Sequence, residues 1–187
     1  DNITHNDASV LTVGTFDGVH RGHQAILSYL RARAKEKGGP STLVSFDPHP
    51  RAVVHGADVP LLTTIPERAQ ILEDHGLDRF VVIPFSQKFA HRSPRDYVEA
   101  VLADRIGLQE ITVGYDHRFG KDRAGDVELL RELGAEHGFA VDVIPPQEVD
   151  HDVVSSSSIR TLLADEGAVE KAGERLGRPY QLQGTVA

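Results

Sequence analysis

The 187-residue sequence contains no cysteine and no methionine. The absence of cysteine excludes disulfides, thiolate nucleophiles and thiolate metal ligands, and it is compatible with a reducing compartment. No apolar run approaches the roughly 20 residues that a membrane-spanning helix needs, and residues 1–7 lack the basic and apolar regions of a signal peptide. These absences lead us to expect a cytoplasmic protein with no membrane partner.

Positive charge is also scarce, because 20 lysines and arginines stand against 28 aspartates and glutamates, a net charge of −8. The two signs are interspersed, and the pI is about 5.6. This balance argues against a protein that coats nucleic acid or a membrane surface. The length suffices for one sizeable domain, so we expect small molecules, and no nucleic acid, as partners.

Apolar runs of strand length alternate with amphipathic segments of helical spacing along the chain. Strands are predicted at 9–13, 41–46, 80–85, 109–114 and 139–144, and helices at 24–34, 64–75, 93–102, 126–137 and 156–163. The last segments predict a short polar helix at 165–172 and the start of a further strand at 182–187. The alternation predicts a doubly wound α/β fold, with a mostly parallel sheet, helices on both faces and right-handed connections.

The stretch 13–24 places three glycines and two histidines between an apolar run and an amphipathic segment. It is predicted to be a strand-to-helix loop, where glycine backbone can approach a ligand and free N–H groups of the helix point at anionic oxygens. His20 and His23 are three residues apart, so both can face such an anion from the first helical turn. This geometry favours a nucleotide phosphate as the ligand.

A second helix start follows later in the chain, where the serines at 155–158 precede Ile159 and Arg160. Their hydroxyls, the free N–H groups and the Arg160 guanidinium suit the outer phosphates of a nucleoside triphosphate.

Several loops leave predicted strands at the same edge of the sheet. They carry His20, Asp47 with His49, Phe85, and residues 115–121. Ligands of parallel sheets bind at the carboxyl ends of the strands, so these candidate site residues are expected to converge there.

Less specific interpretations stay open for each feature. His20 and His23 could start an ordinary surface helix, or they could bind zinc together with His49, because histidine is a common zinc ligand. The serines at 155–158 could cap a helix that binds nothing. His49 could belong to a turn stiffened by its neighbouring prolines.

Five segments, taken in order, carry a resemblance to a known family. They read G-T-F-D-G-V-H-R-G-H at 14–23, F-D-P-H-P at 46–50, R-F-G-K-D-R-A-G-D at 118–126, S-S-S-S-I-R at 155–160 and L-G-R-P-Y at 176–180. The first resembles the H-x-G-H signature of the nucleotidyltransferase superfamily. The whole set resembles the prokaryotic bifunctional riboflavin kinase/FAD synthetases over nearly the entire chain. The resemblance implies a Rossmann-like module that transfers AMP from ATP to FMN, giving FAD and pyrophosphate.

The resemblance also implies roles for particular residues. The reaction needs no protein nucleophile, because the FMN phosphate attacks the α-phosphorus of ATP in line. The implied catalytic residues are His20, His23 and Arg160, and the implied nucleotide-binding residues are Gly14, Phe16, Asp17, Gly18, Gly22, Ser156 and Ser157. Mg²⁺ is expected to bridge the phosphates, and no protein ligand for it is assigned.

The flavin side of the site departs from the family pattern at two positions, Asp116 and His117, where relatives carry an asparagine and an aromatic residue. The residues implied to bind flavin are Phe46, Asp47, Pro48, His49, Asp116 and Arg118. Relatives often read G-x-N-F-x-F-G where this chain has residues 114–120, which places Asp116 at the asparagine position. An asparagine amide can donate and accept hydrogen bonds, whereas an ionised aspartate can only accept them.

Domain boundaries follow from the same resemblance. Residues 1–176 are expected to form the FMN adenylyltransferase domain, and residues 177–187 a linker with the first residues of a riboflavin kinase barrel. Two alternatives remain. One is a non-catalytic flavin- or nucleotide-binding module, and the other is an H-x-G-H transferase with another phosphorylated acceptor, such as glycerol phosphate or phosphopantetheine. The sequence assigns no oligomeric state.

Overall fold

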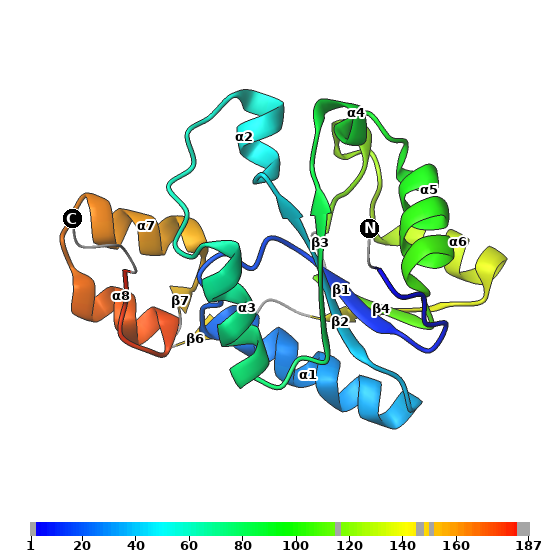
Figure 1. Ribbon diagram of the computed structural model, residues 1–187, viewed down its shortest axis with the longest axis horizontal. Coiled ribbons are helices and arrows are strands. Elements are labelled where there is room, and N and C mark those ends of the chain that lie inside the picture. The colour runs from blue at the N-terminus through cyan, green and yellow to red at the C-terminus, as the bar shows by residue number, and fades with distance from the viewer. Residues whose placement is uncertain (1–2, 115–116, 145–147, 150–151, 183–187) are drawn as a thin grey trace.

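A computed structural model describes residues 3–114, 117–144, 148–149 and 152–182 (Figure 1). Its centre is a five-stranded sheet in the order β3-β2-β1-β4-β5, in which all neighbouring strands are parallel. The strands are β1 (Val10–Val13), β2 (Ser41–Asp47), β3 (Arg79–Pro84), β4 (Glu110–Gly114) and β5 (Ala140–Ile144). This sheet, with helices on both sides, confirms the predicted doubly wound α/β fold.

One face of the sheet is covered by α1 (Arg21–Lys37) and α3 (Ile65–Asp74) (Figure 1). Leu27 of α1 and Leu72 of α3 pack with Leu43 of β2 in one buried cluster. Each helix presents its apolar residues at helical spacing to the sheet, as the sequence periodicity predicts.

The opposite face is covered by α5 (Pro94–Asp96), which continues into η1 (Tyr97–Ile106), and by α6 (Val127–His137) (Figure 1). Leu130 of α6 and Ile111 of β4 belong to the largest buried cluster, which contains residues of η1 as well. The helix predicted at 93–102 therefore runs four residues further, and η1 has π-helical hydrogen bonding over its whole length.

Five short elements were not predicted. They are α2 (Pro50–His55), α4 (Gln87–Ala90), the 3₁₀ turn η2 (Lys121–Arg123), and β6 (Glu148–Val149), which pairs antiparallel with β7 (Asp152–Val153). Segments of two to six residues are too short for a helical or alternating period to show in the sequence. The proline-rich stretch at 47–51, interpreted as a loop, in fact contains the start of α2, with a proline at its first position.

The last two helices, α7 (Ser156–Ala164) and α8 (Val169–Leu176), form a small hydrophobic cluster of their own. α8 lies four residues later than the predicted polar helix at 165–172, because Ala172 and Leu176 provide the buried face that anchors it. The strand predicted at 182–187 falls outside the described residues after 182. No described helix is both long and apolar enough to cross a membrane.

Candidate functional site

A cleft of about 1300 Å³ opens at the carboxyl edge of the sheet. The wall of the cleft includes the last residues of three strands, Val13 of β1, Gly114 of β4 and Ile144 of β5. Gly14, which follows β1, and Phe46, the second-last residue of β2, also line it. The start of α7 closes the cleft on one side. The loops that carry His20, His49, Phe85 and residues 117–121 thus meet at this edge, as the strand order of a parallel sheet predicts.

Positive charge lines this cleft although the chain as a whole is acidic. The cationic lining residues are Arg51, Arg92, Arg118, Lys121, Arg123 and Arg160. Asp122 is the one carboxylate among the lining residues that the structure describes. Since the chain has a net charge of −8, this concentration of cations marks the cleft as a site for a polyanion.

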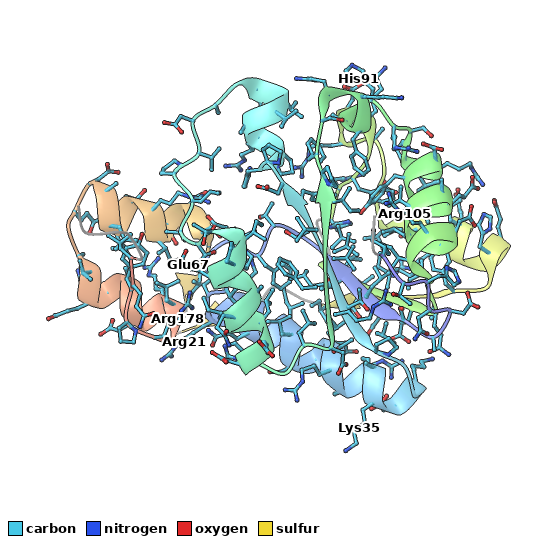
Figure 2. The ribbon with its side chains drawn as sticks, viewed as in Figure 1. Arg21, Lys35, Glu67, His91, Arg105 and Arg178 are labelled. Carbon is cyan, nitrogen blue, oxygen red and sulfur yellow. The ribbon has the colours of Figure 1, made fainter. Side chains whose placement is uncertain are left out.

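The loop between β1 and α1 has a strained backbone. Phe16 and Val19 adopt positive φ angles of 49° and 40°, which are unfavourable for aromatic and β-branched residues. Two distant side chains hold this loop in place. Thr63 Oγ1 accepts a hydrogen bond from Gly18 N at 3.0 Å, and Arg178 Nη2 donates to Gly18 O at 2.8 Å (Figure 2 labels Arg178). The loop therefore presents the residues that follow it in a defined position.

His20 and His23 lie together at the start of α1. His20 is the N-cap of this helix, and its Nδ1 accepts a hydrogen bond from His23 N at 3.4 Å. The two rings stack with centroids 3.6 Å apart, and His23 also stacks on Phe16 at 4.3 Å. Because Nδ1 of His20 is the acceptor, the proton of its neutral ring is on Nε2. His23 Nδ1 is buried and has no hydrogen-bond partner among the described residues.

The pKa values of both imidazoles lie below the ordinary value. Burial lowers the pKa of His20 to about 4, the negative charge of Asp17 opposes this shift, and the positive charge of Arg178 adds to it. Burial also lowers the pKa of His23 well below 6.5, and the charges of His20 and Arg68 act in the same direction. Both rings are therefore neutral at pH 7, and each has one N–H donor for a ligand.

The start of α7 faces the same cleft. Ser155 is its N-cap and accepts from Ser158 N at 3.1 Å, which confirms the predicted helix start. Ser156 Oγ donates to the backbone carbonyl of Asp17 at 2.9 Å and so joins α7 to the β1–α1 loop. Ser157 is exposed and lines the cleft. Two helix N-termini thus converge on one cationic cleft, an arrangement that suits phosphate groups.

Arg160 lies one helical turn further along α7 and also lines the cleft. Its Nε donates to Pro60 O at 2.7 Å, and its Nη2 donates to Asp17 Oδ2 at 2.6 Å. The guanidinium therefore stands at the cleft wall with its charge shared with a buried carboxylate.

Three residues of the implied nucleotide-binding set stand behind the cleft wall. Phe16, Asp17 and Gly18 are buried, and none of these three described residues is part of the lining. Gly22 does line the cleft, and a Cβ atom there would lie 3.3 Å from the His20 ring. Glycine at 22 thus leaves space for the imidazole of His20 next to it.

The other end of the cleft is aromatic. Phe46 is in ring contact with Phe85 at 5.4 Å and with Phe89 at 6.0 Å, and Tyr97 and Phe119 extend this group. All five side chains line the cleft. The Tyr97 hydroxyl is buried without a partner among the described residues, and burial raises the pKa of Tyr97. Sequence reasoning did not single out Phe89, Tyr97 or Phe119, because they belong to three segments that only the fold brings together.

Of the remaining residues implied to bind flavin, some line the cleft and others do not. His49 lines the cleft and caps α2, and burial together with the charge of Arg160 lowers its pKa. Arg118 lines the cleft and forms an ion pair with the N-cap carboxylate of α6 at 2.8 Å. Asp47 and Pro48 are exposed and are not part of the described lining. Asp116 lies outside the described residues.

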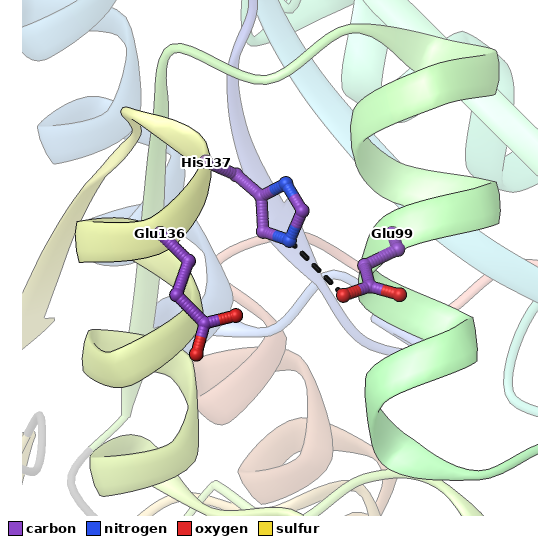
Figure 3. Close-up of side chains that lie close together, drawn as sticks. All are labelled: Glu99, Glu136 and His137. Atoms are coloured by element: carbon purple, nitrogen blue, oxygen red, sulfur yellow. Dashed lines mark hydrogen bonds and ion pairs between the residues drawn. The ribbon is translucent and has the colours of Figure 1, made fainter.

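Figure 3 shows the one group of described side chains whose spacing could hold a metal ion, formed by Glu99, Glu136 and His137. It joins η1 to α6 on the outer surface, where His137 Nε2 lies 3.0 Å from Glu99 Oε1. Arg95 already forms ion pairs with both carboxylates, at 3.0 Å and 2.5 Å. A cation would have to displace this guanidinium, so the group is a network of ion pairs between two helices.

The cleft itself offers little to a metal ion. His20, His23 and His49 do not gather as a ligand set in the described structure, which removes the support for the zinc alternative. Mg²⁺ prefers carboxylate, phosphate and water oxygens, and the described lining provides only Asp122. The described residues therefore do not form a site in which the protein itself would hold Mg²⁺.

The sequence of this chain is similar to known proteins of one family. The sequence matches the FAD synthetase family over residues 2–158. It is 40% identical over 177 residues to a bifunctional riboflavin kinase/FMN adenylyltransferase of Pseudomonas fluorescens, covering 95% of this chain and 57% of the relative. It is 34% identical over 181 residues to an FAD synthetase of Listeria monocytogenes, covering 96% of this chain and 72% of the relative. The chain spans 56–58% of the length of several bifunctional relatives that it matches.

Among solved structures, one from Streptococcus pneumoniae named as a macrolide-efflux protein resembles this chain with a TM-score of 0.83 and 26% identity. The likeness covers 96% of this chain and 58% of that protein. The α/β architecture with its C-terminal helices is therefore shared over nearly the whole described chain.

Proposed function

This chain belongs to the FAD synthetase family, and we propose that it transfers AMP from ATP to FMN, forming FAD and releasing pyrophosphate. One observation carries the proposal: the starts of α1 and α7 converge on a cationic cleft whose far end is aromatic. The cationic end suits a polyphosphate, and the aromatic end suits a flat ring system.

The reaction exchanges one phosphorus–oxygen bond for another. An oxygen of the FMN phosphate forms a bond to the α-phosphorus of ATP, and the bond from that phosphorus to the oxygen bridging to the β-phosphate breaks. Pyrophosphate leaves with the electron pair, so no protein nucleophile is required. The protein contributes by positioning both substrates and by stabilising negative charge on the transferring group.

His20 and His23 are proposed to contact the α- and β-phosphates. His20 has its Nε2–H available, since its Nδ1 accepts from the backbone of α1. Neutral histidines in a buried position are preorganised hydrogen-bond donors, and such donors act most strongly where water is excluded. Ser157 and the N–H groups of α7 are proposed to bind the outer phosphates with Arg160. Mg²⁺ is proposed to enter as part of the MgATP substrate.

The aromatic group around Phe46 supports a flavin as the acceptor rather than glycerol phosphate or phosphopantetheine. A planar isoalloxazine can stack on such rings, whereas small aliphatic acceptors make no comparable contact. The Tyr97 hydroxyl supports the same assignment, because a buried hydroxyl needs a hydrogen-bond partner and the described residues provide none.

The proposed module extends slightly beyond residue 176. Arg178 binds the loop that precedes His20, so we place it within the adenylyltransferase module rather than in a linker. A riboflavin kinase barrel that begins within residues 177–187 stays a prediction.

The test is the formation of FAD and pyrophosphate from MgATP and FMN, with glycerol phosphate and phosphopantetheine as parallel acceptors. His23→Ala is expected to lower kcat about 100-fold or more, the usual effect of removing a preorganised donor. His137→Ala is the matched control, because His137 lies on the outer surface, and its kcat should be unchanged. Failure of the wild-type protein to make FAD at saturating substrate would contradict the proposal.

A further inference from the structure

We propose that Arg68 is a positioning residue for the polyphosphate site. By neutralising Asp17, it leaves the charge of Arg160 available to the outer phosphates of ATP. This inference rests on the proposed function, because it needs ATP as the ligand of the cleft. Arg68 itself is on α3 and is not part of the described lining, so it acts through other residues.

Asp17 is the centre of the arrangement. Its side chain is completely buried. The backbone N–H groups of Leu62 and Thr63 donate to Oδ1 at 3.1 and 3.0 Å, and Leu62 N also donates to Oδ2 at 3.0 Å. The Thr63 hydroxyl also donates to Oδ1, at 3.1 Å. Two guanidinium groups bind the same carboxylate: Arg68 donates to Oδ1 at 3.1 Å, and Arg160 donates to Oδ2 at 2.6 Å. One negative charge thus faces two positive ones.

The two arginines differ in how firmly they are held. Arg68 is 2% exposed, and besides Asp17 it donates to Thr15 O, Thr63 O and Thr63 Oγ1 at 2.8, 3.0 and 3.2 Å. Burial lowers the pKa of Arg68, yet a guanidinium stays protonated at neutral pH. Arg68 therefore has four fixed acceptors around a permanent charge and stays with Asp17.

Arg160 is placed to exchange partners. Its side chain is 15% exposed and stands at the cleft wall, and among the described residues it donates hydrogen bonds to Pro60 O and to Asp17. If Arg160 turns toward a phosphate, Oδ2 of Asp17 keeps the N–H of Leu62, and Oδ1 keeps Arg68. The carboxylate then still has a cation and its backbone donors.

Without Arg68 the same movement would be unfavourable. Arg160 would then be the one cation that the described residues bring to Asp17. Withdrawing it would leave an unpaired buried charge, which is strongly destabilising. Arg160 would then stay on Asp17 and bind phosphate poorly. Removing Arg68 should therefore weaken ATP binding even though Arg68 does not line the cleft.

The experiment measures MgATP affinity by calorimetry in the absence of FMN, on the wild type and on Arg68→Met, Arg160→Met and the double variant. Arg68→Met is expected to weaken MgATP binding about tenfold or more. In the Arg160→Met background the same change should have no further effect, because the residue through which Arg68 acts is gone. Arg33→Met removes an arginine from a buried carboxylate away from the cleft, so it is the matched control and should bind MgATP like the wild type.

A charge-neutral variant separates positioning from a purely structural role. Asp17→Asn combined with Arg68→Met removes both members of the buried pair and releases Arg160, so its MgATP affinity should return to within about threefold of wild type. Arg68→Lys keeps a positive charge but loses the guanidinium fork that reaches four acceptors, so its MgATP affinity should lie between those of Arg68→Met and the wild type. These two variants continue the test if Arg68→Met does not fold.

Three results would overturn the inference. They are unchanged MgATP affinity in folded Arg68→Met, an equal loss in the Arg160→Met background, and a folded Asp17→Asn/Arg68→Met protein that binds MgATP tenfold more weakly than wild type. Absence of MgATP binding to the wild type would overturn it as well. A wild type that binds MgATP but makes no FAD would contradict the proposed function alone, since this test reads binding without FMN.

Discussion

Two buried carboxylates lie at opposite edges of the sheet, and each forms ion pairs with cationic side chains. Asp17 follows β1 at the carboxyl edge, and Glu110 is the first residue of β4 at the other edge. Their side chains are 0% and 1% exposed. Each contacts two cationic side chains: Arg68 and Arg160 for Asp17, and an arginine and a lysine of α1 for Glu110.

The difference between them lies in where the partners come from. Arg33 binds Glu110 in a bidentate arrangement, in which Nε and Nη2 each donate to a carboxylate oxygen at 2.8 Å. Lys37 Nζ lies 3.3 Å from Glu110 Oε2. Both partners come from the end of one helix and are about a third exposed, so this cluster fastens α1 to the sheet. Asp17 instead joins backbone and side chains from several separate segments. The same chemistry thus anchors one helix at one edge and organises a ligand site at the other.

The largest expected effect is the loss of activity when Arg160, at the carboxyl edge, is replaced by methionine. Arg160→Met should lower kcat/KM for FAD formation about 100-fold or more, which corresponds to about 2.7 kcal/mol, because a charge-assisted contact with phosphate is lost. Its free energy of unfolding should change by about 1 kcal/mol or less, since Asp17 keeps Arg68. Steady-state kinetics and urea unfolding measure the two quantities.

Arg33→Met is the control for this prediction and should show the reverse pattern. Its kcat/KM should match the wild type, whereas its free energy of unfolding should fall by about 1–3 kcal/mol, because Glu110 is left with Lys37 alone. Equal losses of activity in both variants would show that the two clusters do not differ as described.

The next effect concerns the pH range in which stability is lost, which should differ between the two edges of the sheet. His20 has a folded-state pKa of about 4 against an ordinary value of 6.5, so the folded state binds fewer protons than the unfolded state between these values. Stability is therefore lost as the pH falls below about 6.5, by about 1 kcal/mol for His20 alone between about pH 7.5 and pH 5.5. Urea unfolding at a series of pH values measures this loss, and His20→Gln should reduce it.

Glu110 affects the free energy of unfolding at lower pH than His20 does. Its hydrogen bonds from Arg33 lower the pKa of this carboxyl below 4.5, so its contribution is present above that value and is lost as the pH falls through the folded-state pKa. The stability difference between wild type and Glu110→Gln should therefore stay constant down to about pH 5 and shrink below it. A difference that already shrinks between about pH 7.5 and pH 5.5 would refute this separation of the two edges.

The sequence predicts much of the fold because its signals are local. Alternating apolar runs and helical periods identify all five strands of the sheet, and Thr64, Ser93, Asp126 and Ser155 were each recognised as helix starts from neighbouring residues alone. The H-x-G-H motif places His20 and His23 at a helix start for the same reason. Features that depend on a few adjacent residues can be predicted from the sequence alone.

The role of Asp17 could not be read in this way. It was assigned to nucleotide binding by its place in the motif, whereas the structure places it behind the cleft wall. Its partners Thr63, Arg68 and Arg160 are 46, 51 and 143 residues away in sequence. No local pattern marks such partners, and Phe89, Tyr97 and Phe119, which join Phe46 in the aromatic group, escape prediction for the same physical reason.

The smallest expected effect concerns the second cation of the Glu110 cluster, which is the counterpart of Arg160. Lys37 is 34% exposed and its Nζ lies 3.3 Å from Glu110, so Lys37→Met should change the free energy of unfolding by about 0.5 kcal/mol or less, with kcat/KM unchanged. Urea unfolding at low and at high salt provides the measurement, because salt screens a contact at the surface. A loss as large as that in Arg33→Met would mean that Glu110, like Asp17, depends on both of its cations. The proposed difference would then be wrong: the Glu110 cluster would not depend mainly on Arg33, while the Asp17 cluster uses both Arg68 and Arg160.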